Sequence, residues 1–134
     1  MTIKIHKGVY DRMIAHAKSG YPNEACGILA GKPKGPAGVF YPMRNADESP
    51  ISYFMDPREQ LGVFKKMREA GLEMKGIFHS HVASAAYPSQ KDVRLAFYPE
   101  ASAVIVSLSD LKKPVVCSFK IDRETVTEEK IEIV

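Results

Sequence analysis

The chain has 134 residues, of which 45% are hydrophobic and 26% charged, and 19 Lys and Arg against 16 Asp and Glu give a net charge of +3. These values exclude a disordered or fibrous chain. Because the chain has no cluster of basic residues, we do not expect it to bind nucleic acid. Because no apolar run approaches ~20 residues, we do not expect it to span a membrane. With no apolar leader sequence, the two cysteines are expected to be reduced thiols of a cytoplasmic protein.

The first predicted elements are a helix and a buried strand. Residues Ile3–Ser19 begin extended and continue as a helix, because Val9, Met13 and Ala17 recur every four residues as one apolar stripe. The short apolar run Ala25–Ala30 is bounded by glycines and prolines, which predicts a buried strand followed by a loop.

A hairpin and a turn-rich segment precede the second helix. We predict that Val39–Met43 pairs with the first buried strand, that Asn45–Pro50 forms turns, and that Ile51–Met55 is another short strand. Asp56 is a good N-cap and Pro57 suits the first position of a helix, so a second helix is expected to begin there.

The second helix leads to a strand that ends in two histidines. Leu61, Phe64 and Met67 form the predicted inner face of the helix. The strand Glu73–Ser80 follows it, and the small residues of Val82–Pro88 predict a loop.

The remaining elements complete an α/β pattern. A short helix is predicted from Ser89 to about Phe97, and the β-branched run Ala101–Leu108 is typical of a central buried strand. Two closing strands are predicted at Val115–Ile121 and Glu128–Val134. Helices and strands interleave, yet hairpins also occur, so we expect a mixed sheet with helices packed on its faces.

One short stretch carries residues suited to chemistry. His79 and His81 stand two residues apart at the end of a predicted strand, so their imidazoles share one face. Such a pair suits Zn²⁺, and Asp92, one turn into the next helix, can bring a carboxylate to the same point. Three protein ligands leave the fourth position for water, and that water needs a base. Glu24, which opens the strand Ala25–Ala30, is the candidate base.

Each of these residues also has a simpler interpretation. A His-X-His pair alone is more often structural, and Ser89 to Asp92 alone favours a helix cap of the S-x-x-[DE] type. Glu24 alone is typical of a surface carboxylate, and Cys26 of a small buried apolar residue. His16 is expected to be exposed. The functional interpretation therefore depends on the joint pattern.

The joint pattern resembles the JAMM (MPN+) metalloprotease motif, which has a Glu and then H-[ST]-H, seven residues, S, two residues and D. Glu24, His79-Ser80-His81, and Ser89 with Asp92 match it, and the spacing after the second histidine has no gaps. The resemblance covers nearly the whole chain. Pro22–Gly31 resembles the family's strand around the catalytic glutamate, and Phe54–Pro57 and Tyr87–Ser89 resemble the bacterial and archaeal single-domain members.

The resemblance implies a single JAMM domain over residues 1–134, with a curved mixed sheet packed between helices and a deaminase-like architecture. It implies that Glu24 holds the water, takes its proton and returns a proton to the leaving amine, while Ser89 donates a hydrogen bond to the oxyanion. It also implies that three residues bind one Zn²⁺ ion per chain: His79, His81 and Asp92.

By the same resemblance, the substrates are amide bonds after the Gly-Gly tail of ubiquitin-like proteins, with the tail held by strand addition at a sheet edge. Asn45–Met55 and Val82–Pro88 are expected to frame its groove. Many eukaryotic members that remove ubiquitin have proline after the second histidine, where this chain has Val82. The chain is more similar to the bacterial members that process sulfur carriers, the CysO-cysteine-type peptidases. The resemblance also admits a homodimer.

The leading hypothesis is a zinc-dependent metallopeptidase that hydrolyses the peptide or isopeptide bond after the Gly-Gly of a ubiquitin-like or sulfur-carrier protein, releasing for example a C-terminal cysteine. The alternative is a non-catalytic scaffold of the same family that binds ubiquitin-like proteins. Scaffold relatives have replaced metal ligands, whereas every motif position is filled here. A nucleoside deaminase is disfavoured because the chain lacks the H-x-E and P-C-x-x-C elements.

Overall fold

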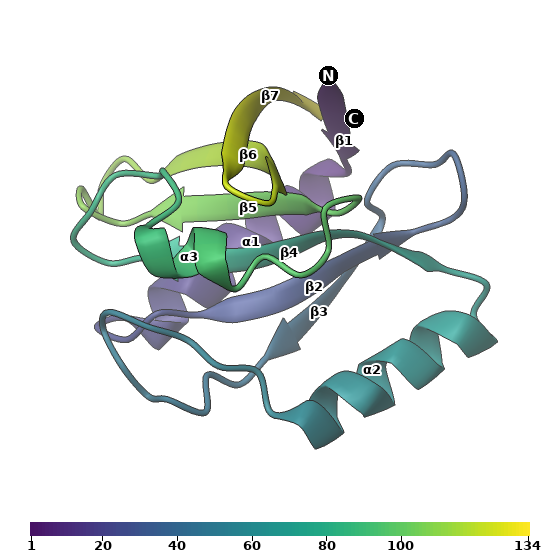
Figure 1. The fold of residues 1–134 in the computed structure, drawn as a ribbon, viewed down its shortest axis with the longest axis horizontal. Helices are drawn as coiled ribbons and strands as arrows, with labels where there is room; N and C mark the ends of the chain where they lie inside the picture. Colours follow the sequence, from purple (N-terminus) through teal and green to yellow (C-terminus); the bar gives the residue numbers. More distant parts are fainter.

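The computed structural model describes all 134 residues and contains one seven-stranded sheet with three helices (Figure 1). The strand order is β1-β7-β6-β5-β4-β2-β3. β1 and β7 are parallel, as are β4 and β5, and the other neighbours are antiparallel, so the predicted mixed sheet is confirmed. The elements are β1 (Thr2–Ile5), α1 (Lys7–Gly20), β2 (Cys26–Gly31), β3 (Val39–Met43), α2 (Pro57–Glu69), β4 (Glu73–His81), α3 (Gln90–Arg94), β5 (Ser102–Ser107), β6 (Val115–Asp122) and β7 (Thr125–Ile133).

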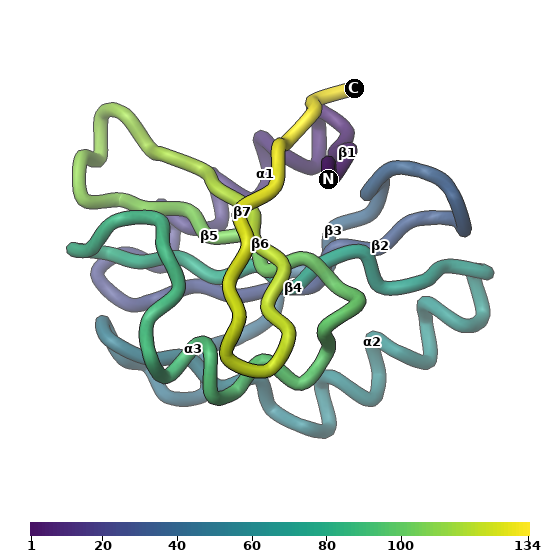
Figure 2. Tube along the Cα trace, turned by 45° about the horizontal axis from the view of Figure 1, so that its top comes forward, coloured from purple at the N-terminus to yellow at the C-terminus, as the bar shows by residue number.

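The sheet curls until its two edges approach each other. Ile5 of β1 forms a bridge to Ala37, which lies just before β3 on the opposite edge. The His6 N–H donates to the Ala37 carbonyl at 3.0 Å, and the Ala37 N–H donates to the Lys4 carbonyl at 2.8 Å. Figure 2 shows the two chain ends close together beside β1 and β7. The curved sheet expected from the family resemblance is therefore present.

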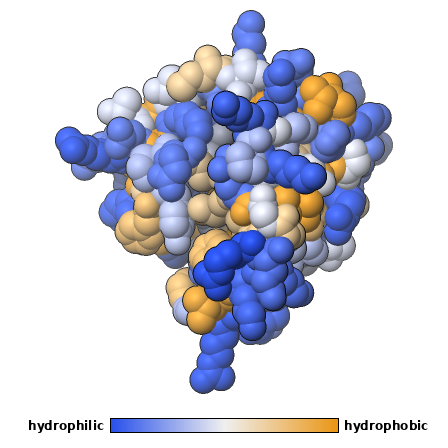
Figure 3. Space-filling model, turned by 90° about the vertical axis from the view of Figure 1, so that its right-hand side faces the viewer, coloured by the Kyte–Doolittle hydropathy of each residue, from blue (hydrophilic) through white to orange (hydrophobic).

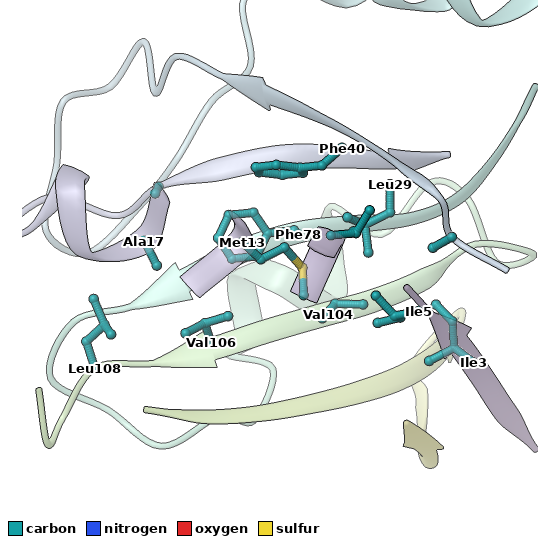
Figure 4. Close-up of a cluster of buried hydrophobic side chains, with 13 residues drawn as sticks. Ile3, Ile5, Met13, Ala17, Leu29, Phe40, Phe78, Val104, Val106 and Leu108 are labelled. Atoms are coloured by element: carbon teal, nitrogen blue, oxygen red, sulfur yellow. The ribbon is translucent and has the colours of Figure 1, made fainter. Parts of the chain in front are cut away.

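The helices cover both faces of the curled sheet. The predicted stripe of Val9, Met13 and Ala17 on α1 is fully buried. Figure 4 shows Met13 close to Phe78 and in one apolar cluster with Leu29. α2 covers the opposite face, where its side chains pack with alternate residues of β2. Because β2 is covered on both sides, it is apolar throughout its length.

α2 begins as predicted but turns a different side chain inward. The Asp56 Oδ1 atom accepts a hydrogen bond from the Arg58 N–H at 2.8 Å, which caps the helix. Val63 and Met67 are buried, whereas Leu61 is 72% exposed, so its predicted place on the inner face is wrong. Val63 stands four residues before Met67, but Leu61 stands six before it and lies about 120° around the helix.

The segment Ile51–Met55 is not the predicted strand. Only Met55 forms a bridge, to Asn45. The Asn45 side chain holds the rest, because its Oδ1 accepts from the Phe54 N–H at 3.1 Å and its Nδ2 donates to the Ser52 carbonyl at 2.9 Å. A side chain that satisfies backbone groups in this way replaces the ladder of a strand.

Three smaller predictions also differ from the structure. α3 ends at Arg94, short of Phe97, and none of its residues is fully buried to stabilise a longer helix. β7 begins at Thr125, before the predicted start, because Arg123 adopts a positive φ of 58° and allows a tight hairpin. His16 is half-buried, and its Nε2 lies 3.1 Å from the Cys26 carbonyl oxygen, so the prediction of an exposed side chain is wrong.

A buried carboxylate joins three strands. Glu129 of β7 is 6% exposed, and its Oε2 accepts hydrogen bonds from the Ser102 hydroxyl of β5 at 2.5 Å and the Ser118 hydroxyl of β6 at 2.8 Å. Glu129→Ala leaves both hydroxyls without this acceptor, so we expect urea denaturation to show a loss of about 2–4 kcal/mol in unfolding free energy. The control Glu128→Ala, at an exposed neighbour, is expected to change it by less than about 0.5 kcal/mol. Equal losses in the two variants would contradict this role.

Part of the exposed apolar surface gathers at one pocket. No helix has the length and apolar character needed to cross a membrane. On the face drawn in Figure 3, hydrophilic side chains dominate and hydrophobic ones form small separate groups. Five exposed large apolar side chains line one pocket beside His79: Ile51, Phe54, Leu95, Phe97 and Tyr98.

Candidate metal centre and active site

The two motif histidines project together from the end of β4. Because they are two residues apart on one strand, their rings fall on the same face, with centroids 4.9 Å apart. The Nε2 atoms of His79 and His81 are 3.1 Å apart, and both side chains are buried. The predicted pairing of the imidazoles is thus present.

Asp92 reaches the same point from α3. Its Oδ2 lies 3.2 Å from the His79 Nε2 and 3.1 Å from the His81 Nε2. The same oxygen accepts the Ser89 N–H at 2.8 Å, and the Asp92 N–H donates to the Ser89 hydroxyl at 3.1 Å. This is a complete capping box, so the cap interpretation is correct. It also fixes the carboxylate against the histidines.

The arrangement fits a small cation. The His81 Nδ1 lies 2.8 Å from the Ala85 carbonyl oxygen. Because a carbonyl only accepts, Nδ1 carries the hydrogen, and the Nε2 of neutral His81 turns a lone pair toward the cluster. Tetrahedral zinc holds its ligand atoms about 3.3 Å apart, close to the 3.1–3.2 Å separations here. The three side chains can therefore hold one metal ion.

The electrostatics of the cluster favour positive charge. Burial alone raises the pKa of Asp92, but its hydrogen bonds with His79 and His81 hold the pKa well below its usual range. Burial lowers the pKa of His81, but the hydrogen bond with Asp92 outweighs this and raises it overall. Both shifts stabilise a charged pair, and a bound cation benefits from the same carboxylate.

Tyr53 supports His79 from the side. The two rings stack with centroids 4.7 Å apart and planes 22° apart. Burial raises the pKa of the Tyr53 hydroxyl, so it stays protonated at neutral pH. The sequence offered no signal for this contact, because Tyr53 belongs to a loop far from the motif in the chain.

Glu24 lies beside the cluster and is only 7% exposed, so the interpretation as a surface carboxylate is wrong. Ser80, between the two histidines, holds it there. The Ser80 hydroxyl accepts the Ala25 N–H at 2.8 Å, and the Ser80 N–H donates to the Ala25 carbonyl at 2.9 Å. Burial raises the pKa of Glu24 to about 7, although the positive charge of His81 opposes the rise. A carboxyl group of this kind can both accept and return a proton.

A pocket of about 220 Å³ opens beside His79 and Asp92. It is lined by Ile51–Met55, by α3 with the residues that follow it, and by residues of the sheet such as Ile77 and Ile105. Of the loop Val82–Pro88, which was expected to frame a groove, only Pro88 lines this pocket. The structure thus brings all five predicted site residues to one region and adds an apolar pocket to them.

Comparison with known proteins agrees with this geometry. Residues 6–122 match the family described as prokaryotic homologs of the JAB domain. A CysO-cysteine peptidase of Mycobacterium tuberculosis is 42% identical over 132 residues, which are 97% of this chain and 90% of that protein. A desampylase of Pyrococcus furiosus is 39% identical over 84 residues, 63% of this chain and 59% of that protein. The solution structure of a Desulfitobacterium hafniense protein has a TM-score of 0.90 and 45% identity, covering 100% of this chain and 93% of that one.

Proposed function

The chain belongs to the prokaryotic JAB-domain family, which is of the JAMM type, and we propose that it is a zinc-dependent peptidase acting on the C-terminal tail of a small ubiquitin-like or sulfur-carrier protein. The observation that carries the proposal is the convergence of two imidazole nitrogens and one carboxylate oxygen within 3.2 Å of one another. Residues 1–134 act in this proposal as a single catalytic domain.

His79, His81 and Asp92, called the donor set below, favour a catalytic zinc ion over a structural one. Three protein ligands, His79, His81 and Asp92, leave one coordination position open, whereas structural zinc sites are closed by four. When bound, zinc supplies a Lewis acid for the scissile carbonyl and activates the attacking water. We assign one ion to each chain.

The protein's own residues move the protons and stabilise the charge. Glu24 accepts a proton from the attacking water and delivers one to the leaving amine, because its carboxyl group is buried and near enough to His81 and Asp92 for their charges to shift its pKa. Ser89 donates a hydrogen bond from its hydroxyl group to the developing oxyanion. The hydroxyl hydrogen is free because the Ser89 oxygen only accepts from the Asp92 N–H.

The substrate class follows from the relatives and from the loops around the donor set. One relative is named for a CysO-cysteine substrate and another as a desampylase. We propose that a carrier tail ending in Gly-Gly enters between Asn45–Pro50 and Val82–Pro88. These loops flank Glu24 and His81, since the Glu24 N–H donates to the Ser49 carbonyl and His81 bonds Ala85.

Cleavage of an extended carrier tests the proposal. The substrate is a ubiquitin-like protein that ends in Gly-Gly and carries one extra C-terminal residue. We expect mass spectrometry to show release of that residue by the purified protein, inhibition by a chelator, and recovery when zinc is added back. Absence of cleavage by the zinc-loaded protein, or cleavage insensitive to the chelator, would refute it.

Tyr53→Leu is expected to weaken zinc binding by about 10- to 100-fold. This is the usual effect of removing a group that orients a metal-binding side chain. Leucine keeps apolar volume but removes the stacked ring that fixes His79. Competition with a fluorescent chelator measures the affinity. Tyr41→Leu, at a half-buried tyrosine of β3, is the control and should bind zinc like the wild type. Equal zinc affinity of the Tyr53 variant and the control would contradict the role of Tyr53 in fixing His79.

A further inference from the structure

The pocket beside the donor set contains one positively charged side chain besides the donor residues themselves. Its lining is mainly apolar and includes Phe54 and Leu95. Apart from the donor residues, the only charged side chain in the lining is Lys91. A volume of about 220 Å³ suits the end of a chain better than a folded partner. The pocket therefore matches a small group that combines an apolar part with a negative charge.

Lys91 has no partner within the protein. It stands between Ser89 and Asp92 in the chain, is exposed, and makes neither a salt bridge nor a side-chain hydrogen bond. Its positive charge acts on Glu24, because it opposes the rise in the pKa of that carboxyl group that burial causes. A free ammonium group near buried reacting groups is placed to bind an anion of the substrate.

We propose that Lys91 binds the free α-carboxylate of the residue that is released. The side chain of that released residue then occupies the apolar pocket. The inference rests on the proposed function and narrows it. Hydrolysis adds water across the amide bond after Gly-Gly, so the carrier leaves with a new carboxylate and the released residue with a new amino group. A single C-terminal amino acid carries a free α-carboxylate, whereas an isopeptide-linked lysine continues into a protein backbone. The enzyme is thus a carboxypeptidase toward its carrier.

Two matched substrates test the inference. A Gly-Gly carrier with one extra C-terminal alanine is made by ligation as the free acid and as the carboxamide. For the wild type we expect kcat/KM to be about tenfold or more higher for the acid, mainly through KM, which is the size of one charged hydrogen bond. Lys91→Ala is expected to reduce the difference between the two substrates to within about twofold. Lys91→Arg is expected to retain most of it.

Arg94→Ala is the control, since it removes one positive charge from the same helix but lies outside the pocket lining. It should keep the full preference for the acid, and zinc content should be equal in all variants. Equal cleavage of acid and amide by the wild type, or an equal effect of Lys91→Ala and Arg94→Ala, would overturn the inference while leaving the proposed function intact. Failure of the zinc-loaded wild type to cleave either substrate would instead refute the proposed function and the inference with it.

Discussion

Glu24→Gln is expected to lower kcat by about 10³-fold while the protein still binds one zinc ion per chain. Glutamine has nearly the shape of glutamate, but it can neither accept the proton of the attacking water nor deliver one to the leaving amine. Steady-state cleavage of the extended carrier measures kcat, and elemental analysis measures zinc. The exposed Glu69→Gln is the matched control and should keep normal turnover.

The same substitution has a predictable effect on the stability of the metal-free protein. Burial raises the pKa of Glu24 from 4.5 to about 7, so between these pH values the folded chain holds a proton that the unfolded chain has released. Wild-type stability therefore falls as the pH rises through this window, and the loss is complete above about pH 7. Glu24→Gln lacks this loss, so its advantage in melting temperature should be larger at pH 8 than at pH 5.

Two outcomes would contradict the role of Glu24. Turnover of Glu24→Gln within a few-fold of the wild type would show that another group carries the proton. A stability advantage that is larger at pH 5 than at pH 8 would show that Glu24 is not a buried carboxyl group that ionises with difficulty.

Asp92→Ala is expected to reduce zinc affinity by more than about 100-fold and to abolish cleavage, because it removes the only anionic ligand. Asp92 also completes the capping box of α3, so a loss of stability of about 1 kcal/mol is expected as well. Isothermal titration with zinc measures the affinity, and urea denaturation measures the stability.

A second helix cap separates the two roles of Asp92. Asp56 caps α2 through the Arg58 N–H and lies outside the donor set. Asp56→Ala should show a similar loss of stability and unchanged zinc affinity. Zinc binding by Asp92→Ala as tight as that of Asp56→Ala would exclude Asp92 as a ligand.

The donor set was predictable from sequence because its geometry is local. A spacing of two on a strand places His79 and His81 on one face, and a capping box fixes Asp92 in the first turn of a helix. Only the meeting of these two elements depends on the tertiary fold. The continuous apolar run of the central strand and the stripe on α1 were predictable for the same reason, since each follows a single period.

The supporting contacts depend on residues far apart in the sequence and could not be predicted. Tyr53 stacks on His79 from a loop in which the Asn45 side chain bonds the backbone of Ser52 and Phe54, on either side of Tyr53. Ser80 acts on Glu24 through the pairing of β4 with the start of β2. Leu61 and Val63 both suit an apolar helix face, and only the packing of α2 on the sheet decides between them.

Crystals of the protein grown with zinc and measured on both sides of the zinc absorption edge test the metal centre most directly. We expect one anomalous peak per chain, at about 2.0–2.2 Å from the His79 Nε2, the His81 Nε2 and the Asp92 Oδ2. A peak at other side chains, or no peak between these three atoms, would contradict a catalytic zinc centre in this protein.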